Sequence, residues 1–299
     1  MTGDFPIIKI LADSPELAEQ LGSKQKFWFR LKFDEQLWLF KFARDGTGEH
    51  WAEKVAAEIA ALIELPAAQV ELADFAGKQG SASRSFVFRH EGYDLVHGDE
   101  LLAGHVIGYD RDKTFRHSSH SIHNIVEAVT KVFPDEATRN TQLTRLAGYI
   151  VLDALIGNTD RHHQNWGVLV RVSPSGQAEH EIAPTFDHAS SLGRNEPEEN
   201  LLRRLRDRTV LNYARKGRGG IYWSGADLKG ANPLDLAERA ARLWPSYFRP
   251  WLQKINQLDE PTYLSIVNRM PNDWMTPAQK EFCIQFLTST TSELKKLTL

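Results

Sequence analysis

The chain has 299 residues, enough for one large domain or two lobes around a sizeable core. Hydrophobic residues make up 41% and charged residues 25% of it, and the net charge of −3 argues against direct nucleic-acid binding. The single cysteine, Cys283, excludes an internal disulfide framework and a cysteine-based zinc site. We find no signal peptide and no stretch apolar enough to span a membrane, so we expect a cytoplasmic protein without membrane contact.

The first 95 residues predict strands around one helix. Alternating apolar residues over 26–33 (KFWFRLKF) and the apolar run 37–42 (LWLFKF) predict two strands joined by a turn. Residues 48–65 predict a helix, because apolar residues recur there at helical spacing. Two further strands and the turn between them are predicted at VELADF (70–75), SFVFRH (85–90) and GKQGSAS (77–83).

From about residue 96 the pattern becomes helical. Helices are predicted over 121–133 and 136–156, the second because Pro134 and Asp135 provide a start signal. A polar loop, GNTDRHHQNWGVL, follows the second helix and leads into a short predicted strand, 166–172.

These elements divide the chain into a strand-rich lobe, 1–95, and a larger, mainly helical lobe, 96–299. The order predicts an α+β fold of two lobes, which is the layout of a clamp around a nucleotide.

Lys41 stands on a strand that is otherwise apolar on both faces. A buried ammonium is unfavourable unless it is paired. Lys41 is therefore either a lysine that reaches water at the strand end or a phosphate-binding lysine held by a carboxylate of the next helix. Glu58 falls at the edge of that helix's apolar stripe, whereas Glu53 points nearly opposite. We predict Glu58 as the partner, with a solvent-exposed Glu58 as the alternative.

The segment LGSKQK (21–26) precedes the first strand of the hairpin. A glycine with small or polar neighbours can form a flap that binds phosphates through backbone N–H groups. Gly22, Ser23 and Lys24 are therefore candidates for nucleotide binding, and an ordinary turn is the alternative.

The polar loop contains Asp160 and Asn165, which have the same spacing as the aspartate and asparagine of the protein-kinase catalytic loop. Phosphoryl transfer to a hydroxyl needs a carboxylate that accepts the proton and oxygen ligands that hold magnesium. Asp187 lies 22 residues after Asn165, and a hairpin turning at SPSGQ (173–177) would bring the two together. With Lys41 they form a kinase set in kinase chain order.

With these motifs, residues 20 to 225 resemble the HipA-like serine/threonine kinases, and the D-R-H-x-x-N core also resembles phosphatidylinositol kinases, which share a two-lobed protein-kinase-like fold. The resemblance rests on LWLFKF with the following helix, GNTDRHHQNWGVL and PTFDHASSLG. It implies ATP and Mg²⁺ as cofactors. The implied roles are catalytic base for Asp160, magnesium ligands for Asn165 and Asp187, phosphate binding for Lys41, and a supporting electrostatic role for His162.

The resemblance also implies a protein substrate and, if the chain is a toxin, an antitoxin protein as partner. Long family members have an N-terminal subdomain ahead of the flap, whereas this chain is expected to be a short, core-only member. Some members phosphorylate a flap serine, for which Ser23 is the candidate here. Another serine cluster, Ser81, Ser83 and Ser85, is more simply a hairpin turn.

Other functions stay open. A lipid or small-molecule kinase would share the motifs, but no basic amphipathic helix or lipid anchor favours a lipid substrate. A metal-dependent hydrolase would use histidines near aspartates, yet His162 and His163 are adjacent and no H-x-H or H-E-x-x-H spacing occurs. A non-catalytic binder would not need every catalytic residue type. The arginine-rich run 203–220 is either an exposed helix with a basic loop or a patch for an acidic protein or nucleic acid.

Overall fold

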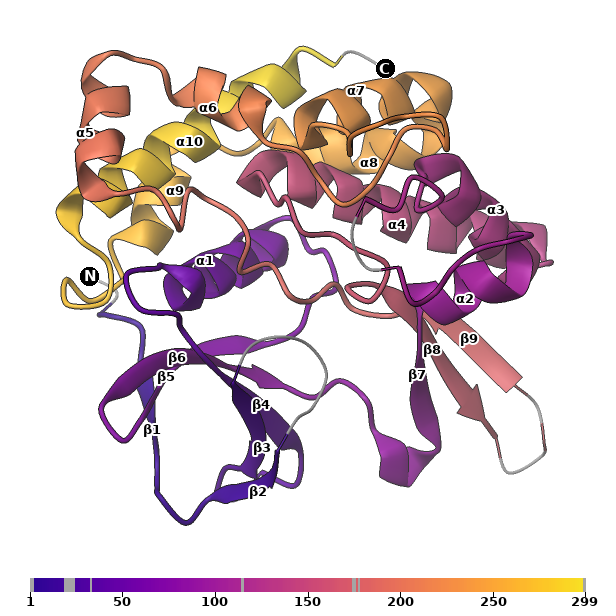
Figure 1. Cartoon of the computed structure of the whole chain (residues 1–299), viewed down its shortest axis with the longest axis horizontal. Coiled ribbons are helices and arrows are strands. Elements are labelled where there is room, and N and C mark those ends of the chain that lie inside the picture. The colour runs from indigo at the N-terminus through magenta and orange to yellow at the C-terminus, as the bar shows by residue number, and fades with distance from the viewer. Residues whose placement is uncertain are drawn as a thin grey trace.

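The computed structural model describes residues 3–18, 25–32, 34–113, 116–173, 176 and 178–297. It has a strand-rich N-terminal part with a curled sheet and a helical C-terminal part, so the predicted α+β class is confirmed (Figure 1). Within the described residues, none of the helices combines the length and apolar character that crossing a membrane requires.

Six strands form the N-terminal sheet, in the order β1-β5-β6-β4-β3-β2. The pair β1 and β5 is parallel and the other neighbours are antiparallel. The strands are β1 (Ile7–Ile10), β2 (Pro15–Ala18), β3 (Lys26–Arg30), β4 (Leu37–Phe42), β5 (Val70–Phe75) and β6 (Lys78–Arg84). One face buries an aromatic cluster that includes Phe27, Phe29 and Phe40, as the alternation predicts.

The hairpin after β5 turns earlier than predicted. Ala76 and Gly77 have φ values of 53° and 79°, so the chain reverses within these two residues. β6 therefore occupies most of 77–83, where a turn is predicted, and that prediction is wrong. The predicted strand over 85–90 is also wrong, because residues 85–88 belong to no helix or strand.

Helix α1 (Glu49–Leu62) packs between the N-terminal sheet and the helical part (Figure 1). Every side chain from Glu49 to Ala56 is buried, whereas Leu62 is 43% exposed. The first half of α1 thus has no face toward solvent, and its charged residues are buried as fully as its apolar ones.

A second, antiparallel sheet has the order β7-β8-β9, and its strands are β7 (Tyr93–His97), β8 (Gly167–Val172) and β9 (Ala178–Ile182). A short 3-10 helix, Arg89–Glu91, precedes it. β7 crosses the predicted lobe boundary at residue 95 and pairs with β8 of the helical part; the boundary itself stays a prediction.

The remaining helices build the C-terminal part around α4, which is buried along most of its length. The predictions over 121–133 and 136–156 are confirmed as α3 and α4. The helices are α2 (Gly98–His105), α3 (Ile122–Val132), α4 (Glu136–Ile156), α5 (Glu198–Arg206), α6 (Val210–Lys216), α7 (Pro233–Leu243), α8 (Pro245–Ile255), α9 (Glu260–Val267) and α10 (Pro277–Lys295).

Candidate active site

Helix α4 delivers the polar loop to the site. The Asp135 side chain caps the start of α4 by accepting the Thr138 N–H, and Gly157 ends the helix in the left-handed region, with φ 64°. A Cβ on Gly157 would lie 2.4 Å from the Phe286 ring, so glycine is needed for space as well as conformation. The buried helix therefore stops at a defined residue, and the loop begins from a fixed point.

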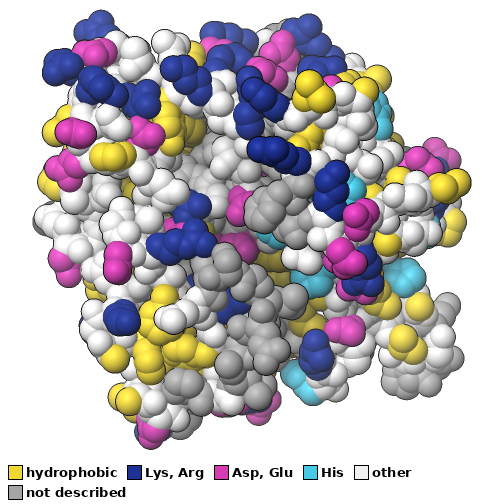
Figure 2. Space-filling view, viewed as in Figure 1, with side chains coloured by type: hydrophobic (Ala, Val, Ile, Leu, Met, Phe, Trp, Pro, Cys, Tyr) yellow, Lys and Arg dark blue, Asp and Glu magenta, His cyan; other side chains and the backbone are white. Residues whose placement is uncertain are grey.

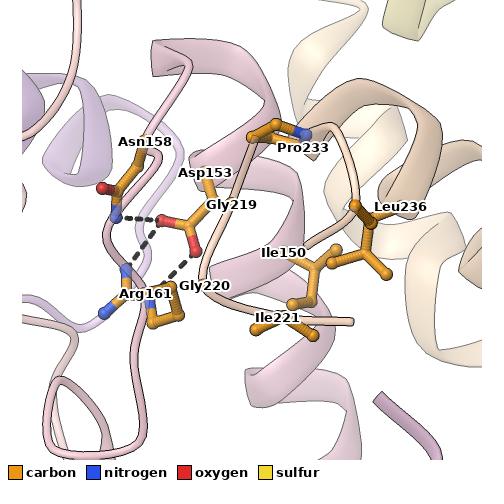
Figure 3. Close-up of a pocket in the computed structure, with 10 residues that line it drawn as sticks. Ile150, Asp153, Asn158, Arg161, Gly219, Gly220, Ile221, Pro233 and Leu236 are labelled. Atoms are coloured by element: carbon orange, nitrogen blue, oxygen red, sulfur yellow. Dashed lines mark hydrogen bonds and ion pairs between the residues drawn. The ribbon is translucent and has the colours of Figure 1, made fainter. Parts of the chain in front are cut away.

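A buried ion pair anchors the loop. The Asp153 carboxylate accepts hydrogen bonds from Arg161 Nη2 at 2.7 Å and Nε at 2.9 Å, and from Asn158 Nδ2 at 2.8 Å (Figure 3). Burial alone would lower the pKa of Arg161, but the charge of Asp153 outweighs it and the pKa is raised. The cavity beside this pair measures only ≈ 10 Å³, about the space of one water. The pair is therefore a structural anchor and not a ligand site.

Arg161 also joins the loop to the segment that carries Asp187. Its Nη1 donates to the Asn165 carbonyl at 2.7 Å and to the Phe186 carbonyl at 3.1 Å. The sequence-predicted pair of metal ligands is thus brought together by a third side chain, in addition to the hairpin formed by β8 and β9.

Asp160 and Asn165 are held against each other. Asn165 Nδ2 donates to the Asp160 carbonyl at 2.8 Å, and the Asp160 N–H donates to Asn158 Oδ1 at 3.1 Å. Since the Asn165 amide nitrogen is used in this way, its Oδ1 is left to face a ligand. The Asp160 side chain itself is exposed.

Lys41 meets Asp187 across the site. Lys41 Nζ lies 3.0 Å from Asp187 Oδ1, with 12% of the lysine side chain and 32% of the aspartate side chain exposed. Burial lowers the pKa of Lys41, but the charges of Asp187 and Glu53 overcome that effect, and the ammonium stays charged. Asp187 has φ 59°, a conformation that is uncommon for a non-glycine residue and is found at functional sites.

The predicted pairing of Lys41 with Glu58 is wrong. Glu58 Oε1 binds Lys54 at 2.7 Å, whereas the carboxylates of α1 whose charges raise the pKa of Lys41 are Glu53, which is 1% exposed, and Glu49. Glu53 accepts the His188 N–H at 2.8 Å, and its Oε2 is buried without a hydrogen-bond partner among the described residues. The helical wheel failed because α1 is buried on every side here, so the side opposite the apolar stripe is also interior.

A cavity of ≈ 160 Å³ opens beside Asp160. Burial lowers the pKa of His120 to about 3 and that of His163 to about 4, so these imidazoles are neutral at pH 7. His163 Nε2 is buried without a hydrogen-bond partner among the described residues. The lining residues are Arg116, His117, His120, Thr159, Asp160, His162, His163, Gly219, Gly220 and Tyr222.

His162 faces the same cavity with a defined tautomer. Its Nδ1 accepts the Gln164 N–H at 3.2 Å, which leaves the ring proton on Nε2. Burial lowers the pKa of His162 more than the charges of Asp160 and Asp187 raise it. His162 thus offers a neutral N–H donor beside Asp160.

The donor set at this site fits magnesium better than zinc. Mg²⁺ is usually held by one or two carboxylates or other oxygens, with water and phosphate completing its shell. The Asp187 carboxylate and the Asn165 amide oxygen are oxygen donors of this kind. Among the described residues no group of three or more His, Cys, Asp or Glu side chains is arranged to hold a metal ion.

The predicted flap cannot be placed on this site, because Gly22, Ser23 and Lys24 lie outside the described residues. The other serine cluster is not the turn that the sequence suggested. Ser81 lies in β6 directly opposite Lys41.

The arginine-rich run forms α5 and α6, where Lys and Arg side chains gather on the upper part of the molecule (Figure 2). Much of its charge is paired within the chain: Arg204 with Glu196, and Arg215 with both Asp235 and Glu293. The loop after α6 packs on the catalytic loop, since a Cβ on Gly220 would lie 2.8 Å from the Arg161 carbonyl.

Fold and site together define a two-lobed protein-kinase-like protein. In the solved structures, the proinflammatory kinase CtkA of Helicobacter pylori matches with a TM-score of 0.79 at 22% identity, over 97% of this chain and 98% of that one. The HipA-like C-terminal domain family matches residues 19–241, and the chain belongs to this family.

Two further comparisons add less. The structure of Shewanella oneidensis MR-1 HipA with HipB and operator DNA matches with a TM-score of 0.44 at 11% identity, over 95% of this chain and 68% of that one. A search of curated proteins gave no significant match.

Sequence reasoning missed several residues of this site. The histidines of the 117–120 segment gave no motif, because they reach the site from a segment far from the loop. Glu53 was considered as the partner of Lys41 and rejected, because it lies opposite the apolar stripe of its helix. Glu53 could have been found from its spacing with Glu49 on one side of α1. Ser190 and Arg194 lie in and just after the PTFDHASSLG motif, where only Asp187 was selected.

Proposed function

We propose that the chain is an ATP- and Mg²⁺-dependent kinase that phosphorylates serine or threonine on a protein. The observation that carries this proposal is the convergence on one site of Lys41, Asp187 and the Asp160–Asn165 loop, joined by Arg161. Each of these residue types serves a distinct need of phosphoryl transfer: a cation for phosphates, oxygens for magnesium and a carboxylate for the acceptor proton.

In the proposed mechanism Lys41 binds the phosphates of ATP, with its charge maintained by Asp187 and Glu53. Asn165 and Asp187 would hold Mg²⁺, which supplies charge neutralisation on the phosphates when bound. Asp160 orients the acceptor hydroxyl and takes its proton. Because the transition state is loose, most of the rate acceleration comes from positioning and electrostatics.

The cavity beside Asp160 is the proposed entry for the acceptor. Its position places an incoming hydroxyl next to the exposed carboxylate, and the His162 Nε2–H provides a neutral donor there. A protein acceptor is proposed over a lipid because no basic amphipathic helix marks the sequence. By family membership we also propose a growth-arresting, toxin-like role with an antitoxin protein as partner.

The test is transfer of labelled γ-phosphate from ATP by the purified chain, alone and with cell extract. Wild-type protein should label itself or a protein band. Asp160→Asn should lower transfer at least about 1,000-fold with an unchanged melting temperature, because the carboxylate is exposed and its replacement is isosteric. Transfer at the wild-type rate would refute the role of Asp160. Labelled lipid would identify the lipid-kinase alternative. If the wild-type chain arrests growth, Asp160→Asn should relieve that arrest.

A further inference from the structure

The Asp160 carboxylate has a single hydrogen-bonding partner among the described residues, the Ser190 hydroxyl, 3.3 Å from Asp160 Oδ2. Ser190 is fastened to the loop through its main chain as well. Its carbonyl accepts the Thr159 N–H at 3.1 Å, and the Leu192 N–H donates to the Ile156 carbonyl at 2.9 Å. The segment from 190 to 192 therefore runs along the catalytic loop, and Ser190 is fixed beside the base.

Arg194 determines which way the Ser190 hydroxyl points. Arg194 Nη2 donates to Ser190 Oγ at 2.9 Å. A guanidinium can only donate, so it occupies a lone pair of Oγ and leaves the hydroxyl proton free to point at Asp160. Two hydrogen bonds in series also polarise each other, which strengthens the contact with the carboxylate.

Arg194 is in turn held at the start of α1. Its Nη1 binds Glu49 Oε1, and the Gly48 N–H donates to the Arg194 carbonyl at 2.8 Å. Glu49 is 3% exposed, so this contact is shielded from competing water. The helix that carries Glu53 is thereby connected to the base through a continuous set of hydrogen bonds.

We propose that Ser190 is a positioning residue for Asp160, and that Arg194, held by Glu49, directs the Ser190 hydroxyl and so couples the placement of α1 to the alignment of the base. The proposal rests on the proposed kinase function. By holding Oδ2, Ser190 leaves Asp160 Oδ1 facing the acceptor.

During transfer the acceptor oxygen bonds to the γ-phosphorus and its proton passes to Asp160. The bond between the γ-phosphorus and the bridging oxygen breaks, and its electron pair leaves with ADP.

The test measures labelled phosphate transfer against ATP concentration for Ser190→Ala, Ser190→Thr and Ser191→Ala. Ser190→Ala should lower kcat about 10- to 100-fold with little change in the KM for ATP, because an orienting hydrogen bond to a charged group is lost. Ser190→Thr keeps the hydroxyl and should restore most of the rate. Ser191→Ala is the matched control: its hydroxyl donates to the His188 carbonyl and not to Asp160, so kcat should stay near wild type.

A double-mutant cycle tests the coupling through Arg194. If Arg194 acts through Ser190, Arg194→Gln should slow transfer in the wild-type background and have little further effect on Ser190→Ala. If the rate losses of Arg194→Gln and Ser190→Ala multiply in the double variant, the proposed coupling is overturned.

A wild-type kcat in Ser190→Ala, or an equal loss in Ser191→Ala, would overturn the positioning role while the kinase function stands. Absence of transfer by the wild-type chain would overturn the proposed function and this inference with it.

Discussion

Two buried lysines lie in the N-terminal part of the molecule, Lys54 on α1 and Lys41 on β4, and they differ in how completely they are bonded. Lys54 Nζ donates to Glu58 at 2.7 Å, Glu71 at 2.8 Å and the Val70 carbonyl at 2.9 Å. These contacts use all three donors of an ammonium. Lys54 is thus fully satisfied by the fold.

The Lys41 ammonium, by contrast, meets a single partner atom among the described residues, Asp187 Oδ1. Two of its donors are left for a ligand, and its partner is a third exposed and sits on the loop that would hold magnesium. Burial of a charged group therefore does not by itself mark a functional site. A buried charged group that still has unused hydrogen-bond donors does point to a functional site, because folding has buried it without giving it a full set of hydrogen-bond partners.

Within this comparison of the two lysines, the largest effect is expected when each is replaced with methionine. Lys41→Met should lower phosphate transfer about 100-fold or more with little loss of stability, because its cation serves the substrate. Lys54→Met should keep most of the activity but lose about 2 kcal/mol of stability, since two carboxylates lose their cation. Phosphate-transfer assays and chemical denaturation of both variants test this. Equal losses of activity and equal losses of stability in the two variants would contradict the difference between the lysines.

The partner carboxylates allow a second contrast. Asp187→Asn should weaken the magnesium-dependent binding of ATP about tenfold or more, because a neutral amide is a poorer ligand for a hard cation. Glu71→Gln, which affects the Lys54 side, should leave binding unchanged. Calorimetry with and without Mg²⁺ measures both, and equal affinities for the two variants would contradict the role of Asp187.

The two glutamates of α1 offer a smaller contrast. Glu53→Gln removes a charge that acts on Lys41 while keeping an acceptor oxygen for the His188 N–H, so transfer should fall about tenfold. Glu58→Gln should transfer phosphate at the wild-type rate, because among the described residues its carboxylate contacts Lys54 and not Lys41. A drop in Glu58→Gln as large as that in Glu53→Gln would revive the sequence-based choice of Glu58.

The buried His120 responds to pH in the opposite way to Lys41, whose pKa is raised. Burial holds the pKa of His120 at about 3 in the folded protein, against 6.5 for an unperturbed imidazole. Between these values the unfolded chain binds a proton that the folded protein does not, so stability is full above pH 6.5 and falls as the pH is lowered. His120→Gln should reduce the slope of the free energy of unfolding against pH by about 1.4 kcal/mol per pH unit between pH 6 and 4. Denaturation at several pH values tests this, and an unchanged slope would contradict it.

The chemistry of the loop was predictable because it is local. Asp160 and Asn165 are separated by a fixed number of residues, and the strand after them could be recognised from its own pattern. The choice between Glu53 and Glu58 was not predictable in this way. A helical wheel assumes that one face of the helix is buried. Helix α1 is enclosed between a sheet and other helices, which a helical wheel cannot take into account.

By itself the sequence determined the α+β class, the strand that carries Lys41 and the two long helices, because each depends on periodicity. The assignment of Asp160, Asn165 and Asp187 as a kinase set stays a prediction. Tertiary structure decided which carboxylates act on Lys41, how Arg161 joins the loop to the segment of Asp187, and that Ser190 and Arg194 lie between α1 and Asp160. The contact of Arg161 with the Phe186 carbonyl spans 25 positions of the chain, and that of Arg194 with Glu49 spans 145. Such contacts exist only once the core has packed and excluded the alternatives.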